Sequence, residues 1–167
     1  DVRGGRFSAS PLPSEKSREV MRSVVRILGG AKRIPFSHRE PQQAVPQVVA
    51  SYVKQVAIRH SIEPEDLIEW VASEVELGFA PGWLLAVNKS EPPFEFVPQS
   101  ERKWTCTRCG FQHLHGSAGV CANRRCNSLE LVEPPLTEAD TDYYGWLATL
   151  PPRRLAVAEL TGQTRPL

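Results

Sequence analysis

Four cysteines within 21 residues constrain this chain of 167 residues more than any other feature of its sequence. Two form a C-x2-C pair and two form a C-x4-C pair, with eleven residues between the pairs; they are Cys106, Cys109, Cys121 and Cys126. Four thiolates in two such pairs make the closed tetrahedral ligand set of a structural zinc site. Gly110 suits the left-handed residue that follows the tight turn between paired ligands. The sequence therefore predicts a four-cysteine zinc-binding module over residues 101–133, in which Zn2+ holds the fold and performs no chemistry.

Two disulfides and a redox-active C-x2-C pair are the alternative interpretations of these cysteines. Disulfides need an oxidising compartment, and the sequence shows no secretory signal. A redox pair needs no second pair of cysteines. We therefore expect reduced thiols and a cytoplasmic location. His113 and His115 lie between the pairs and could replace a cysteine, but with four thiolates present we expect them to be solvated or to support the ligands.

The charge of the chain is unevenly distributed, although its net charge is only +1. Residues 1–40 carry nine Lys and Arg against four acids, residues 41–100 three against eight, and residues 101–130 five against two. No apolar run approaches the roughly 18 residues of a membrane span. The basic residues around the cysteines are candidates for contact with the DNA backbone, with an ordinary charged surface as the alternative; they are Arg102, Lys103, Arg108, Arg124 and Arg125.

The N-terminal half of the chain predicts three helices. After an irregular arm over residues 1–13, Ser14 is a candidate N-cap for a helix that ends at Gly29 and Gly30. On one face of this helix basic residues recur at every fourth position; they are Arg18, Arg22 and Arg26. Such a row either binds phosphates or is an ordinary solvated face. A second helix has Pro46 in its first turn and is marked by Val45, Val48, Val49, Tyr52, Val53 and Val56. A third helix runs from Pro64 to Gly78.

Two extended segments, Trp83–Val87 and Phe94–Val97, follow the third helix. Three helices and a hairpin are the components of a winged-helix domain, which we favour over a small helical bundle with a flap for residues 14–100. The third helix carries five acids, however, which is the wrong sign for entering a DNA groove. A winged-helix domain of this kind would have an architectural role and would not recognise a specific DNA sequence.

Beyond the cysteines, residues 134–167 predict a helix that starts near Thr137 and a buried strand from Arg153 to Leu160. The runs at residues 142–147, 153–155 and 159–164, together with the cysteine module, resemble a segment of very large bacterial superfamily 2 (DEAD/DEAH-type) helicases of phage-defence systems, of the Druantia and dpd types. The resemblance covers about residues 104–164. It implies that residues 134–167 lead into the second RecA-like domain of such a motor.

The resemblance implies an accessory segment of an ATP-dependent DNA helicase in anti-phage defence. Its partners would be DNA, the remaining helicase domains and other defence proteins. ATP and Mg2+ would be bound by domains absent from this chain, since the sequence contains no phosphate loop and no Asp-Glu box. We expect no catalytic site in the chain itself.

The predicted fold class is α+β, with a helical region, a zinc ribbon and a helix–strand segment in this order. Three hypotheses for function remain open at this stage. The first is a zinc-stapled accessory region of a helicase. The second is a free-standing zinc-ribbon adaptor that binds nucleic acid, and the third is a structural zinc domain that packs on its neighbours.

Overall fold

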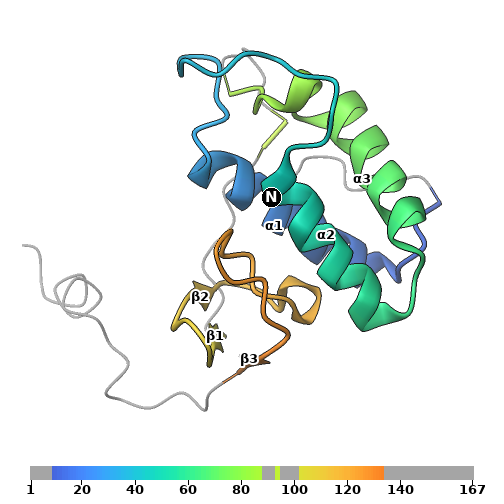
Figure 1. Ribbon diagram of the computed structural model, residues 1–167, viewed down its shortest axis with the longest axis vertical. Helices are drawn as coiled ribbons and strands as arrows, with labels where there is room; N and C mark the ends of the chain where they lie inside the picture. Colours follow the sequence, from blue (N-terminus) through green and yellow to red (C-terminus); the bar gives the residue numbers. More distant parts are fainter. Residues whose placement is uncertain (1–8, 88–92, 95–101, 134–167) are drawn as a thin grey trace, which may run out of the picture. The chain divides into compact units, whose positions relative to one another are not determined.

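The computed structural model describes residues 9–87, 93–94 and 102–133 (Figure 1). These residues form three helices, two short 3-10 helices and one small sheet. The helices are α1 (Ser14–Gly30), α2 (Gln47–His60), α3 (Pro64–Gly78), η1 (Pro81–Trp83) and η2 (Ser117–Gly119), and the strands are β1 (Trp104–Cys106), β2 (Gln112–His113) and β3 (Leu131–Val132). The predicted α+β class is confirmed at this level. The predicted helix near Thr137, the strand over residues 153–160 and the first eight residues of the N-terminal arm lie outside the described residues.

Helix α1 differs from its prediction at its start and agrees with it at its end. Pro13 occupies the N-cap position and Ser14 is already helical, so the expected side-chain cap by Ser14 is wrong. The helix ends at Gly30, as predicted, and Lys32 just beyond it adopts a left-handed conformation with φ +56°. There the Arg33 N–H donates to the Leu28 carbonyl at 2.9 Å, which satisfies a carbonyl at the helix end.

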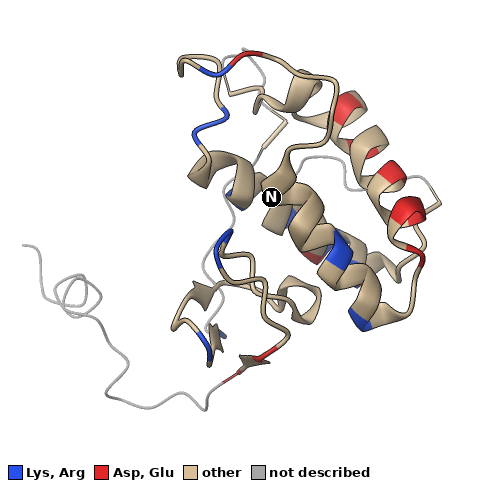
Figure 2. Ribbon diagram, viewed as in Figure 1, with Lys and Arg blue, Asp and Glu red and all other residues tan. Residues whose placement is uncertain are grey.

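The other two helices follow the local signals. Helix α2 begins at Gln47, so Pro46 is its N-cap and not part of its first turn as predicted, and it ends where Ser61 turns left-handed with φ +55°. Helix α3 begins with Pro64 in the first helical position, where its missing N–H costs nothing, and ends at Gly78 as predicted. Acidic residues recur along α3 (Figure 2), so the expected acidic surface is present on this helix.

The hydrophobic core is built from the apolar faces of the three helices. Side chains without solvent exposure include Val20, Val24, Leu28, Val49, Val53, Val56, Leu67, Val71 and Val75. Phe79 and Trp83 extend this core beyond α3. Ala118 and Val120, which lie between the two cysteine pairs, belong to the same cluster, so the helices and the cysteine module share one core.

The predicted strand from Trp83 to Val87 is wrong. Trp83 closes η1 with φ +61°, and residues 84–87 have no strand partner among the described residues. This segment instead packs onto the loop after α1, because Arg33 donates its Nε–H to the Trp83 carbonyl at 2.8 Å and accepts the Leu85 N–H at its own carbonyl at 3.0 Å. Of the second predicted strand, only Phe94 lies within the described residues. The winged-helix arrangement therefore stays a prediction.

The sheet is antiparallel with the strand order β2-β1-β3. Trp104 pairs with His113 across β1 and β2, and Cys106 pairs with Leu131 across β1 and β3. Strands this short do not stabilise a sheet by themselves, so the module needs another source of stability. None of the helices in the described part of the chain has the length and apolar character of a membrane span.

Candidate metal centre

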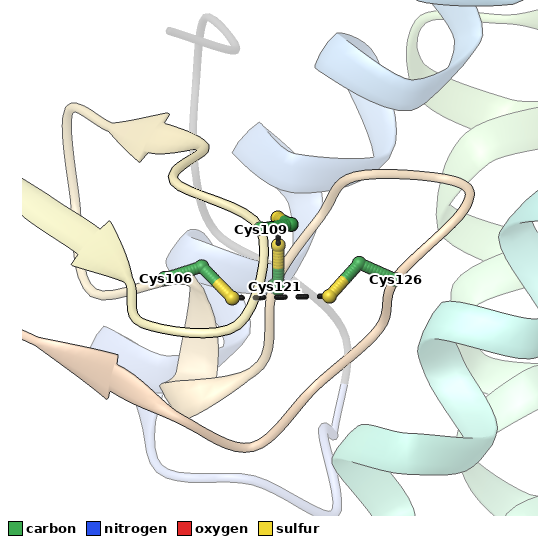
Figure 3. A group of neighbouring side chains, drawn as sticks. All are labelled: Cys106, Cys109, Cys121 and Cys126. Atoms are coloured by element: carbon green, nitrogen blue, oxygen red, sulfur yellow. Dashed lines mark hydrogen bonds between the residues drawn. The ribbon is translucent and has the colours of Figure 1, made fainter.

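The four cysteine sulfur atoms converge on one point (Figure 3). All four Sγ atoms lie within 4.8 Å of one another. Cys106 Sγ is 3.8 Å from Cys126 Sγ, and Cys109 Sγ is 3.7 Å from Cys121 Sγ. A tetrahedral zinc ion with Zn–S bonds of about 2.3 Å requires sulfur separations of about 3.8 Å. A disulfide requires about 2.05 Å, and all four cysteines are free. The cluster can therefore hold a metal ion such as zinc, and its geometry is not that of two disulfides.

The first cysteine pair forms a tight turn at the end of β1. The Gly110 N–H donates to the Cys106 carbonyl at 2.8 Å, and Gly110 has φ +71°, the left-handed conformation that its position predicts. The backbone N–H of Phe111 then hydrogen-bonds the Cys109 sulfur. We call residues 106–110 the first knuckle.

The second cysteine pair repeats this turn with a different residue at its start. Asn123 stands three residues before Cys126 and accepts the Cys126 N–H at its carbonyl at 2.8 Å. Asn127 then takes the left-handed conformation with φ +49°, as Gly110 does in the first knuckle. Cys121 lies two residues before the turn. The C-x4-C spacing thus places one ligand before the turn and one at its end; we call residues 121–127 the second knuckle.

The Asn123 side chain joins the two knuckles. Its Nδ2 donates to the Cys109 sulfur at 3.6 Å, and its Oδ1 accepts the Arg125 N–H at 3.1 Å. A donor that bonds a ligand atom orients it and disperses its negative charge. Sequence reasoning missed Asn123, although an asparagine that starts a turn between two ligands is a recognisable signal.

The environment of the thiols differs from one cysteine to the next. Burial raises the pKa of Cys109, but hydrogen bonds from the Phe111 N–H and the neighbouring cysteines outweigh it and bring the pKa to about 7. Burial raises the pKa of Cys121 well above its usual range. Without a metal ion Cys121 is therefore a thiol at neutral pH, and metal binding must release its proton.

The two histidines between the knuckles are not metal ligands in this geometry. The group that could bind a metal contains the four cysteines and neither histidine. His113 is fully buried, so the expected solvated position is wrong for it, and its ring meets the Phe111 ring edge-on at 5.1 Å. Burial and the nearby Arg26 lower the pKa of His113 to about 4. His115 accepts the Ser117 N–H at its Nδ1 at 3.1 Å.

The residues between the knuckles include a left-handed turn, η2. Ser117, Ala118 and Gly119 have φ of +50°, +49° and +77° in succession. A residue other than glycine costs about 1–2 kcal/mol in this conformation. Ser117 and Ala118 are also buried, so their backbone polar groups need partners within the protein.

Helices α1 and α2 supply those partners. From α1, the Glu19 carboxylate accepts the Ala118 N–H at 2.7 Å, and the Ser23 hydroxyl lies 2.7 Å from the Ser117 hydroxyl. From α2, the Tyr52 hydroxyl donates to the Ser117 carbonyl at 3.0 Å. The turn between the cysteine pairs is thus docked on the helices by a buried polar network, which sequence reasoning did not predict.

The three arginines of the α1 row lie in two different environments. The Arg26 guanidinium lies 4.3 Å from the centre of the Phe111 ring and interacts electrostatically with Cys121. It therefore faces the cysteine module as a cation–π partner and a countercharge. Arg18 and Arg22 line a separate cavity nearer the start of the helix.

The five basic residues predicted to contact nucleic acid fall into two groups. Arg108 lies in the first knuckle, Arg124 and Arg125 lie in the second, and all three are exposed. Arg102 and Lys103 lead into β1. Arg102 forms an ion pair with Glu133 and lies over the Trp104 ring at 5.3 Å.

Comparison of the chain with protein-family models, with curated proteins and with solved structures gives no significant match.

Proposed function

We propose that the chain is a zinc-stabilised module that binds nucleic acid as an accessory segment of a large ATP-dependent DNA helicase. The zinc ion is structural in this proposal: four thiolates fill its coordination sphere and leave no position for water or substrate. The sulfur separations of 3.7 and 3.8 Å support zinc as the metal. The module itself carries out no reaction.

The observation that carries nucleic-acid binding is the position of the three exposed knuckle arginines, Arg108, Arg124 and Arg125. Both knuckles contain cysteines of one cluster, so these arginines belong to neighbouring turns. A zinc ion with four thiolates carries a net charge of −2, which Arg26 and the three knuckle arginines together exceed. A phosphate backbone is the ligand that such a cationic end attracts.

The helicase context rests on the resemblance of residues 104–164 to superfamily 2 helicases of phage defence. In that context the motor hydrolyses ATP elsewhere, and this module shapes the path of the DNA or docks a partner. The test is the DNA-stimulated ATPase activity of the native polypeptide that contains the segment. Replacing Cys121 by Ser in that polypeptide should lower the stimulation by DNA while leaving the basal ATPase intact.

A purely structural zinc domain is the second candidate. The buried network of Glu19, Ser23 and Tyr52 with η2 favours this candidate, because the network packs the cysteine module against α1 and α2. The two candidates predict different dependences of DNA affinity on salt concentration.

Binding of labelled DNA to the zinc-loaded chain, measured over a series of salt concentrations, tests the proposal. We expect the logarithm of the affinity to fall linearly with the logarithm of the salt concentration. Replacing Arg124 and Arg125 by Gln should reduce the slope by about two units, one for each phosphate contact. Lys32→Gln with Arg39→Gln removes the same charge at two exposed positions outside the cysteine module and should leave the slope unchanged. Absence of binding, or binding that ignores salt, supports the structural candidate instead.

A further inference from the structure

A second basic site lies away from the knuckles, in a cavity of about 460 Å3 between the first half of α1 and the start of β1. We call it the α1–β1 cavity. Four cations from two segments distant in the sequence line it: Lys16, Arg18 and Arg22 from α1, and Arg102 before β1. Trp104 and His115 line the same cavity.

Three carboxylates also line the cavity, and two of them are already engaged. Glu133 is ion-paired with Arg102. Glu19 accepts the Ala118 N–H and pairs with Lys16 Nζ at 3.1 Å. The third is Glu15. Four cations against three carboxylates leave the lining with one positive charge in excess.

Cations of α1 act on the histidine in the cavity wall. Burial, followed by the charges of Arg22 and other nearby cations, lowers the pKa of His115 to about 3. Cations lower a histidine pKa because they repel its second proton, and the same field attracts an anion.

Trp104 contributes an aromatic ring to the lining of the cavity. The Arg102 guanidinium lies over this ring, 5.3 Å from its centre. Both kinds of group stack on nucleobases in sites for single strands. A volume of about 460 Å3 lies within the range of pockets for small ligands and suits one nucleotide.

We propose that the α1–β1 cavity binds one nucleotide of a single-stranded nucleic acid, with the base against Trp104 and its phosphate at Arg18 and Arg22. This inference rests on the proposed function and deepens it, because it selects single strands and adds a base-stacking site to the phosphate contacts of the knuckles. A duplex keeps its bases paired and stacked, so it cannot use the Trp104 ring.

The test is fluorescence anisotropy of a labelled oligothymidylate of about ten nucleotides, titrated with the full zinc-loaded chain. Arg18→Gln with Arg22→Gln should weaken binding and reduce the salt slope by about two units. Trp104→Leu should weaken binding about tenfold without changing the slope, since stacking releases no counterions. Trp104→Phe retains an aromatic face and should recover most of the affinity. Lys32→Gln with Arg39→Gln is the charge-matched control.

Zinc content and circular dichroism show whether each variant is folded. If Trp104→Leu fails to fold, the Trp104→Phe and arginine variants still decide the matter. A second arm adds thymidine monophosphate and inorganic phosphate as competitors, and a duplex of the same length. We expect the nucleotide to compete better than phosphate, and the duplex to be insensitive to Trp104→Leu.

The outcomes separate this inference from the proposed function. If the cavity variants behave like the control while Arg124→Gln with Arg125→Gln weakens binding, the cavity inference is wrong and the proposed function stands. If the unaltered chain binds neither the single strand nor the duplex, both are wrong, and if it binds the duplex alone, only the single-strand inference is wrong. If the mononucleotide binds and the oligonucleotide does not, the cavity is a site for small anions and the single-strand inference is overturned.

Discussion

Tyr52 is fully buried in the helical core, yet its hydroxyl reaches out of that core to the Ser117 carbonyl at 3.0 Å. Burial raises its pKa far above the usual range for tyrosine, so the hydroxyl stays neutral and acts as a donor. A single side chain thus belongs both to the apolar face of α2 and to the polar network beneath η2. Such a residue reports directly on the contact between helices and cysteine module.

Tyr52→Phe removes this hydroxyl without changing the shape of the ring. We expect a loss of about 1–3 kcal/mol in the free energy of unfolding, because the Ser117 carbonyl is left buried with a weaker set of partners. Urea denaturation of the zinc-loaded protein measures it. Ser51→Ala, one residue earlier on the same helix and only partly buried, should change stability by less than about 0.5 kcal/mol. Equal effects at both positions would show that the network contributes nothing specific.

At the scale of elements, η2 connects the two knuckles through a conformation that most residues avoid. Gly119 is its last left-handed residue, with φ +77°, and a Cβ there would overlap the Arg59 guanidinium. Arg59 in turn donates to the Leu129 carbonyl at 3.3 Å, which lies beyond the second knuckle. The turn therefore depends on glycine at a position where the chain also approaches α2 closely.

Gly119→Ala should destabilise the protein by about 1–2 kcal/mol from backbone conformation alone, and displacement of Arg59 adds to this loss. Gly30→Ala is the matched control, since Gly30 is helical and nothing lies within 4 Å of a Cβ at that position. There the same substitution should be neutral or stabilise by up to about 0.5 kcal/mol. Thermal melting of both variants decides between these signs. A neutral Gly119→Ala would contradict the role of the turn.

At the scale of the whole molecule, the candidate metal site and the helical core are coupled. Ala118 and Val120 join the hydrophobic cluster of the helices, and the network of Glu19, Ser23 and Tyr52 holds the same segment. The strands of the small sheet have only two or three residues and contribute little stability. We therefore expect a bound metal ion to supply most of the stability of the cysteine module. Loss of the metal should therefore reach α1 and α2.

Removal of zinc by a chelator should disorder the cysteine module. It should also destabilise the helices, which would lower the melting temperature recorded by their circular dichroism signal. The effect depends on pH in a defined direction. Protons compete with zinc for the thiolates, and burial raises the pKa of Cys121, so the stability contributed by zinc declines as the pH falls.

Melting curves in a zinc buffer at about pH 8 and about pH 6 measure this dependence, with the chelated protein as the control. The gap between zinc-loaded and chelated samples should narrow at the lower pH. A helical signal that melts identically with and without chelator at both pH values would show that the helices fold independently of the site.

Local signals in the sequence determined the cysteine cluster and much of the helical part. The spacing of Cys106, Cys109, Cys121 and Cys126 predicts a four-thiolate cluster because tight turns have few geometries. Pro64 marks the start of α3 because the first helical position needs no N–H, and Gly78 marks its end. These features involve neighbours within a few residues, which is the range over which backbone preferences act.

Only the tertiary structure decided which residues meet across the chain. Trp83 and Leu85 carry a strand-like pattern, but Arg33 binds their backbone fifty residues away in the sequence and replaces the expected strand. Arg26 shares a row with Arg18 and Arg22, yet it stacks on Phe111 while the other two line the α1–β1 cavity. Long-range contacts of this kind depend on packing and buried hydrogen bonds that no local pattern encodes.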